Sequence, residues 1–157
     1  MRTIHWLYLV TVLLFVASVA LFVMGASADA RIAQEAAAVA TVRQVMDGIV
    51  APAAEKVFDS VATIVTVEGT EERQPRTEAE WALVGANAAA LIEAGNLLMM
   101  GDRLKDEDEW IAMTRAMMDA AAISLKATEA RDVEALLNSG EAINSSCDTC
   151  HMKYSTP

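Results

Sequence analysis

Reactive sulfur and imidazole groups are scarce in this chain, which has two cysteines and two histidines among 157 residues. Cys147 and Cys150 are its one Cys-x-x-Cys pair, so no second pair exists to complete a four-cysteine zinc site. A zinc ion held by both thiols and the neighbouring His151 would still need a fourth ligand, and ligands packed so closely give poor tetrahedral geometry. The other histidine, His5, lies in an apolar N-terminal segment. The sequence therefore argues against a structural zinc centre.

Glycine, proline and aromatic residues are also few, with seven glycines, three prolines and 5% aromatics. The chain is instead rich in alanine and methionine, which favour helices. No strand pattern is evident, and the predicted fold class is all-α. The same lack of strands argues against a thiol-disulfide enzyme, whose Cys-x-x-Cys normally lies near the start of a βαβ unit.

Basic residues are outnumbered, because 12 lysines and arginines face 22 aspartates and glutamates for a net charge of −10. So acidic a surface argues against nucleic acid and anionic membrane as binding partners. It suits a basic redox partner, although the same charge also serves ordinary solubility. The sequence by itself does not choose between these two uses of the charge.

The N-terminus has the pattern of an export segment. Arg2 precedes a nearly uninterrupted apolar run over residues 4–24, and small residues at 26–28 form a small-x-small cleavage site. The run is also long enough to span a bilayer as a helix. Residues 1–28 are therefore predicted to be a cleaved signal peptide or an uncleaved membrane anchor. Both alternatives place residues 29–157 outside the cytoplasm, in the periplasm.

The last segment of the chain predicts an amphipathic helix that carries both cysteines on its buried face. Its apolar and small residues follow one another at alternating spacings of three and four, which is the repeat of a helix stripe. Asp132 is a plausible N-cap, and His151 lies one turn beyond Cys147. The stripe consists of Val133, Leu136, Gly140, Ile143, Cys147, Cys150 and Tyr154.

Three further stripes predict three more helices, over residues 39–64, 81–98 and 110–127. The first stripe, which includes Val42, Met46 and Ile49, stays in phase through Pro52, which predicts a bend and not an end. The second follows a capping box that begins at Thr77. The longest polar connection covers residues 68–76. Four helices with mostly short connections predict that residues 29–157 form one domain, an antiparallel four-helix bundle.

The pentapeptide Cys147-Asp148-Thr149-Cys150-His151 has the pattern of a c-type haem attachment site. Each of its two thiols can form a thioether with one vinyl group of a porphyrin. The histidine after the second thiol is then held below the iron as an axial ligand. The sequence thus predicts one covalently bound haem c, with His151 on the iron. A dithiol redox site and a metal site without haem are the alternatives.

With this motif on its last helix, the chain resembles the class II c-type cytochromes, the cytochrome c′ and c-556 family. The Lys153-Tyr154 pair after the motif and the segment Arg43-Gln44-Val45-Met46 on the first helix are similar to positions of that family. The resemblance implies a four-helix bundle that carries electrons in the periplasm, often as a homodimer. In low-spin members, a methionine of the first helix supplies the second axial ligand, and this role falls here to Met46.

Met46 also suits this role by its chemistry, because it lies on the predicted inner stripe and a thioether is a soft ligand for haem iron. A methionine on such a stripe also serves packing. The remaining alternative is an open distal site that would bind NO or CO. The rival methionines are Met99, Met100, Met113, Met117 and Met118.

No arrangement of histidine, arginine and acidic residues predicts a dedicated catalytic site, so an electron carrier is expected and not an enzyme. Trp81 and Trp110 could border a porphyrin. Because each tryptophan begins a core stripe, packing between helices is the expected role of both.

Overall fold

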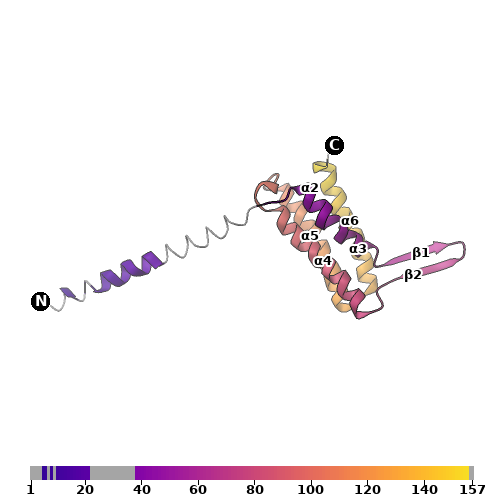
Figure 1. Cartoon of the computed structure of the whole chain (residues 1–157), viewed down its shortest axis with the longest axis horizontal. Coiled ribbons are helices and arrows are strands. Elements are labelled where there is room, and N and C mark those ends of the chain that lie inside the picture. The colour runs from indigo at the N-terminus through magenta and orange to yellow at the C-terminus, as the bar shows by residue number, and fades with distance from the viewer. Residues whose placement is uncertain (1–4, 7, 9, 22–37, 156–157) are drawn as a thin grey trace. The chain divides into compact units, whose positions relative to one another are not determined.

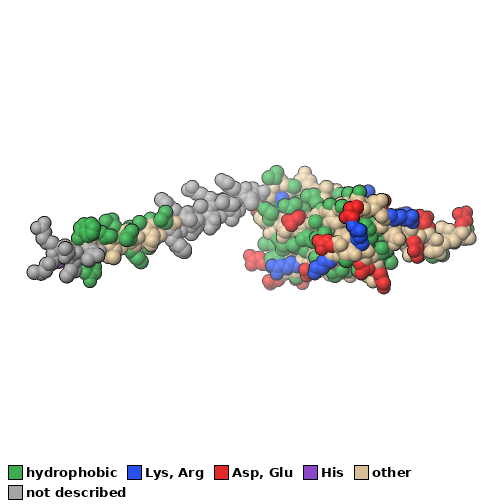
Figure 2. Space-filling model, turned by 90° about the horizontal axis from the view of Figure 1, so that it is seen from below, with side chains coloured by type: hydrophobic (Ala, Val, Ile, Leu, Met, Phe, Trp, Pro, Cys, Tyr) green, Lys and Arg blue, Asp and Glu red, His purple; other side chains and the backbone are tan. Residues whose placement is uncertain are grey.

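The computed structural model of this protein describes residues 5–6, 8, 10–21 and 38–155 (Figure 1). The chain divides into two units, residues 1–37 and 38–157, and each is described by itself. In the first unit, Val10–Leu21 form an apolar helix whose described side chains are largely hydrophobic and exposed (Figure 2). The predicted cleavage site at 26–28 lies outside the described residues.

One helix among the described residues, α4 (Glu78–Leu98), is long and apolar enough to cross a membrane. Its large apolar side chains, among them Trp81, Leu91 and Leu98, are buried in the core of the second unit. A core helix passes the same test of length and composition, so the test does not assign α4 to a membrane.

The second unit is mostly helical, with a small two-stranded antiparallel sheet. The helices lie side by side, and the hairpin projects from one end of them (Figure 1). Helix α5 packs against both α4 and α6, and α3 contacts the same two helices. In chain order the elements are α2 (Val42–Val45), η1 (Met46–Val50), α3 (Ala51–Phe58), β1 (Ala62–Thr66), β2 (Gly69–Arg73), α4, η2 (Gly101–Arg103), α5 (Glu109–Ala130) and α6 (Val133–Tyr154).

The predicted capping residues begin their helices as expected. At the start of α4, the hydroxyl of Thr77 accepts the N–H of Glu80 at 3.2 Å, and the Glu80 carboxylate accepts the N–H of Thr77 at 2.8 Å. This reciprocal pair satisfies two N–H groups that have no partner within the helix. The Asp132 carboxylate accepts the N–H of Ala135 at 2.9 Å at the start of α6. The capping box and the Asp132 cap are thus confirmed.

The prediction of one helix over residues 39–64 is wrong at its C-terminal end, where the otherwise helical unit contains a small two-stranded sheet. The helical path passes through Pro52, as predicted, but it ends at Phe58. Residues 62–66 form β1, and the predicted polar connection at 68–76 contains β2. The segment Ala62–Thr66 is mostly β-branched, which favours strands. Over so short a segment, apolar spacing does not distinguish a helix from a strand.

The first helix also differs in its phase. The predicted stripe contained Val42, Met46 and Ile49, yet the structure buries Val45 and Val50 and leaves the other three partly buried. The reason is that η1 is a π-helical turn and not an α-helical one. A π turn holds one more residue than an α turn, so the buried positions lie five residues apart. A search for the α-helical repeat cannot detect such a turn.

The contact between α4 and α5 is close at Gly95. A methyl group added there would overlap the Met118 side chain and approach Cγ2 of Thr114 at 3.5 Å. At Gly140 of α6, an added methyl would meet Phe58 at 3.6 Å, which is ordinary van der Waals contact. Helix packing therefore favours glycine at position 95, whereas position 140 has room for a larger residue.

Gly95→Ala is expected to lower the free energy of unfolding by about 1–3 kcal/mol, because the added methyl overpacks the α4–α5 contact. Gly140→Ala is the matched control, and it should raise stability by up to about 1 kcal/mol because alanine favours helix. Urea denaturation followed by circular dichroism measures both values. Equal stabilisation by the two substitutions would contradict the close contact at Gly95.

Candidate functional site

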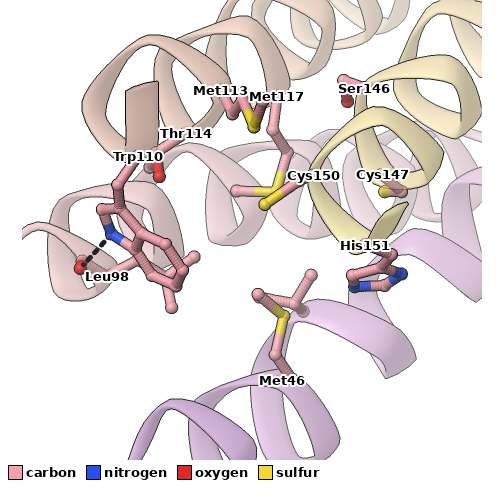
Figure 3. Close-up of a pocket in the computed structure, with 11 residues that line it drawn as sticks. Met46, Leu98, Trp110, Met113, Thr114, Met117, Ser146, Cys147, Cys150 and His151 are labelled. Atoms are coloured by element: carbon pink, nitrogen blue, oxygen red, sulfur yellow. Dashed lines mark hydrogen bonds between the residues drawn. The ribbon is translucent and has the colours of Figure 1, made fainter. Parts of the chain in front are cut away.

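The predicted site residues Cys147, Cys150, His151 and Met46 line one pocket between the helices (Figure 3). The cavity between them is small, about 40 Å³, and it is partly open to solvent. The residues that line it belong to η1, α4, α5 and α6. The full lining consists of Met46, Val50, Leu98, Trp110, Met113, Thr114, Met117, Ser146, Cys147, Cys150 and His151.

Helix α6 places the Cys-x-x-Cys-His motif along one side of this pocket. Cys147 and Cys150 are partly buried, as their places on the predicted stripe require, whereas His151 is exposed. Burial raises the pKa of Cys147, and the charge of Asp148 raises it further. Burial and the neighbouring Cys147 raise the pKa of Cys150. Both groups are therefore protonated thiols at neutral pH, whereas a reactive redox cysteine needs a lowered pKa.

The two thiols and the imidazole do not converge on one point as the ligands of an ion would. Within residues 5–6, 8, 10–21 and 38–155, no group of three or more histidine, cysteine, aspartate and glutamate side chains could hold a metal ion. Cys147, Cys150 and His151 instead lie in succession along a mostly apolar wall (Figure 3). This donor set therefore suits a group joined through sulfur better than a chelated ion.

Met46 reaches the pocket from the other side, at the first residue of η1. Its partly buried side chain extends from the helix toward the pocket that His151 also lines (Figure 3). Of the five rival methionines, Met113 and Met117 of α5 also line the pocket. Met99, Met100 and Met118 do not. Three methionines therefore remain as candidates for the second axial ligand of a haem iron. Met46 is the one among them that belongs to the first helix.

Trp110 takes part in both packing and the pocket. Its ring is 2% exposed, as expected of a core residue, and it also forms a wall of the pocket. The Trp110 Nε1–H donates to the carbonyl of Leu98 at 2.9 Å, which fixes the orientation of the ring. Trp81 is buried but does not line the pocket. The sequence offered one signal for this difference, since Trp110, Met113 and Met117 follow a single stripe of α5.

Asp106 ties the beginning of α5 to the end of α6, a contact that the sequence did not predict. One carboxylate oxygen accepts the backbone N–H groups of Glu109 and Trp110, each at 2.9 Å. The other oxygen accepts the phenol of Tyr154. The Tyr154 ring meets Trp110 edge-on, with ring centroids 4.9 Å apart and planes at 78°. Next to it, Lys153 pairs with Glu109.

This contact lies directly beside the motif, because Tyr154 follows His151 by less than one helical turn. The wall that carries the two thiols is thereby held against the wall that carries Trp110. Desolvation and the hydrogen bond to Asp106 raise the pKa of Tyr154 to about 12. The same hydrogen bond, with the N–H of Trp110, lowers the pKa of Asp106.

Comparison with protein-family models, with curated proteins and with solved structures finds no match to this chain.

Tyr154 is expected to ionise near pH 12, well above its ordinary value near 10. Because the unfolded chain gives up this proton first, the stability contributed here should fall as the pH rises from about 10 to 12. Asp106→Asn removes the negative charge and should bring the pKa back toward 10. Ultraviolet absorbance of the phenolate measures the titration, and Tyr154→Phe assigns the signal against Tyr8. Identical titrations with and without the Asp106 carboxylate would contradict this contact.

Proposed function

We propose that this protein is a monohaem c-type cytochrome that carries electrons in the periplasm. The observation that supports the proposal is the pocket that joins Cys147, Cys150 and His151 of α6 with the Met46 thioether of η1. The two thiols would hold one haem c covalently, and His151 and Met46 would be the axial ligands of its iron. No catalytic residue is proposed, because the pocket holds no further acid or base.

The residues of the pocket suit this group. Two sulfur atoms for thioether bonds and an imidazole for the iron lie in sequence along α6, and the remaining walls are largely apolar. When bound, the haem supplies one-electron exchange between ferrous and ferric iron. The buried side chains of Trp110, Leu98 and Met117 would shield the inner side of the haem from water. A thioether ligand from Met46 would favour the ferrous state and raise the reduction potential.

The class II bundle belongs to the same proposal. The helical path α2–η1–α3 would form one helix of an antiparallel four-helix bundle, and α4, α5 and α6 would form the others. The succession of contacts from α3 to α4, α5 and α6 supports this arrangement. The hairpin β1–β2 is an addition to it. The homodimer implied by the resemblance stays an expectation.

The N-terminal segment and the net charge of the chain support the proposed export and the proposed redox partner. The exposed apolar helix Val10–Leu21 supports a signal peptide over residues 1–28 or a membrane anchor through residues 4–24. The net charge of −10 supports a basic redox partner. Acidic side chains occur at several places on the visible face of the helical unit, with basic ones between them (Figure 2). This distribution does not single out one docking patch.

The second candidate function is the binding of NO or CO at an open distal position. It is favoured by the pocket that Met46 lines together with His151, because part of this pocket is open to solvent. In that case Met46 would limit access to the iron sterically and would not bind it. A dithiol enzyme is disfavoured, because the pKa of both thiols is raised.

The intact mass of the exported protein should exceed that of the polypeptide by one haem. Cys147→Ser combined with Cys150→Ser should abolish this addition, because serine forms no thioether. Ser145→Ala, at an exposed position of the same helix, is the control and should keep the haem. A wild-type mass without haem would refute the cytochrome proposal and return attention to the free thiols.

Met46→Ala is expected to convert a low-spin ferrous spectrum into a high-spin one that changes when CO is added, because the iron loses its sixth ligand. Its reduction potential should fall for the same reason. Met113→Ala, which also alters a methionine of the pocket, should leave the spectrum unchanged. If wild-type protein is already high-spin and binds CO, the gas-binding function replaces electron transfer.

A further inference from the structure

The π-helical turn η1 lies directly before Pro52, and the chemistry of proline accounts for it. Proline has no N–H to donate, and in a regular α-helix its ring would clash with the carbonyl four residues earlier, that of Gly48. The structure avoids this clash by widening the preceding turn. The N–H of Ala51 donates to the carbonyl of Met46, five residues back instead of four. The wide turn thus begins at the proposed iron ligand.

The wide turn changes which side chains reach the interior. Each residue of an α-helix turns the chain by about 100°, so one extra residue rotates everything before it by that angle. An unbroken α-helix would place Met46 on the same line as Ala53 and Val57, in the middle of the core face. In the structure Val45 takes that place, with 2% of its surface exposed. Met46 lies beside it and lines the pocket.

Pro52 and Gly48 can affect the pocket only through the backbone. Both are exposed, and neither lines the pocket. A side chain added at Gly48 would meet no other atom within 4 Å. Val50, the last residue of η1, is buried and lines the pocket together with Met46. The two pocket residues of the first helix therefore both belong to the turn that the proline widens.

We infer that Pro52 is a positioning residue, which sets the phase of the first helix so that the Met46 thioether enters the pocket. This inference rests on the proposed function, because it concerns the distal side of the same haem. Pro52 is exposed and does not line the pocket. Because proline has no backbone N–H, position 52 cannot form the hydrogen bond of a regular α-helix, and the preceding turn is a π turn. This turn sets the positions of Val45 and Met46 around the helix. Pro52, although exposed, would thereby determine whether Met46 closes the distal side of the proposed haem or leaves it open.

Two variants and one control test this inference. Pro52→Ala restores an N–H at position 52, so the turn should contract to an α turn and carry Met46 out of the pocket. In the second variant, Pro52→Ala is combined with deletion of Gly48. That deletion removes the residue that the wide turn accommodates, so a regular helix should again deliver Met46 to the pocket. Glu55→Ala, at an exposed position of α3, controls for a surface change that keeps the proline.

The visible spectrum with and without CO is the first readout. Pro52→Ala should show the high-spin, CO-binding spectrum of Met46→Ala, whereas the deletion variant and Glu55→Ala should match wild type. Nuclear magnetic resonance of the backbone gives a readout independent of ligation. The pairing of the Ala51 N–H with the Met46 carbonyl should disappear in Pro52→Ala. Circular dichroism and intact mass establish that each variant is folded and carries haem.

The outcomes separate the inference from the proposed function. Wild-type protein without covalent haem refutes the cytochrome proposal itself. Haem without any spectral effect of Met46→Ala refutes ligation by Met46, and the role of Pro52 falls with it. A Pro52→Ala spectrum equal to wild type, beside an altered Met46→Ala spectrum, overturns the inference alone. A deletion variant that is folded but still high-spin overturns it as well.

Discussion

The packing of α5 between α4 and α6 is the contact on which the rest of the structure depends. Trp110 joins α5 to α4 through the Leu98 carbonyl, and Ser124 joins it to α6 through a buried hydroxyl pair with Ser139 at 2.7 Å. The Tyr154–Asp106 contact closes the same interface beside the motif. Because buried polar groups cost free energy unless they are paired, each bond also fixes the register of the helices. The pocket keeps its walls because these registers are fixed.

Much of this arrangement could be predicted from local sequence patterns. The stripe of α6 places Cys147 and Cys150 toward the interior, and the structure finds both in the pocket. The starts of α4 and α6 follow from side chains that cap their own helices. Helix stripes and N-caps depend on residues three or four positions apart, so they can be identified directly from the spacing of residues in the sequence.

The features that escaped prediction depend on other physics. The contact between Asp106 and Tyr154 joins residues 48 positions apart, and no local pattern encodes it. The π turn before Pro52 keeps the apolar composition of a helix while shifting its phase. The strand at 62–66 competes with a helix whose apolar spacing is nearly the same. In each case tertiary packing or backbone sterics decides between local structures that the sequence permits equally.

The hairpin β1–β2 differs from the helices in how it resists opening. Its second strand is exposed throughout, and Val65 and Val67 near its tip are 77% and 105% exposed. Two strands with so little buried apolar surface have only marginal stability of their own. The hairpin therefore opens with a small free energy, whereas the helices open only when the core unfolds. Backbone amides of β1 and β2 are therefore expected to exchange with solvent through this local opening, without unfolding of the helices that form the pocket.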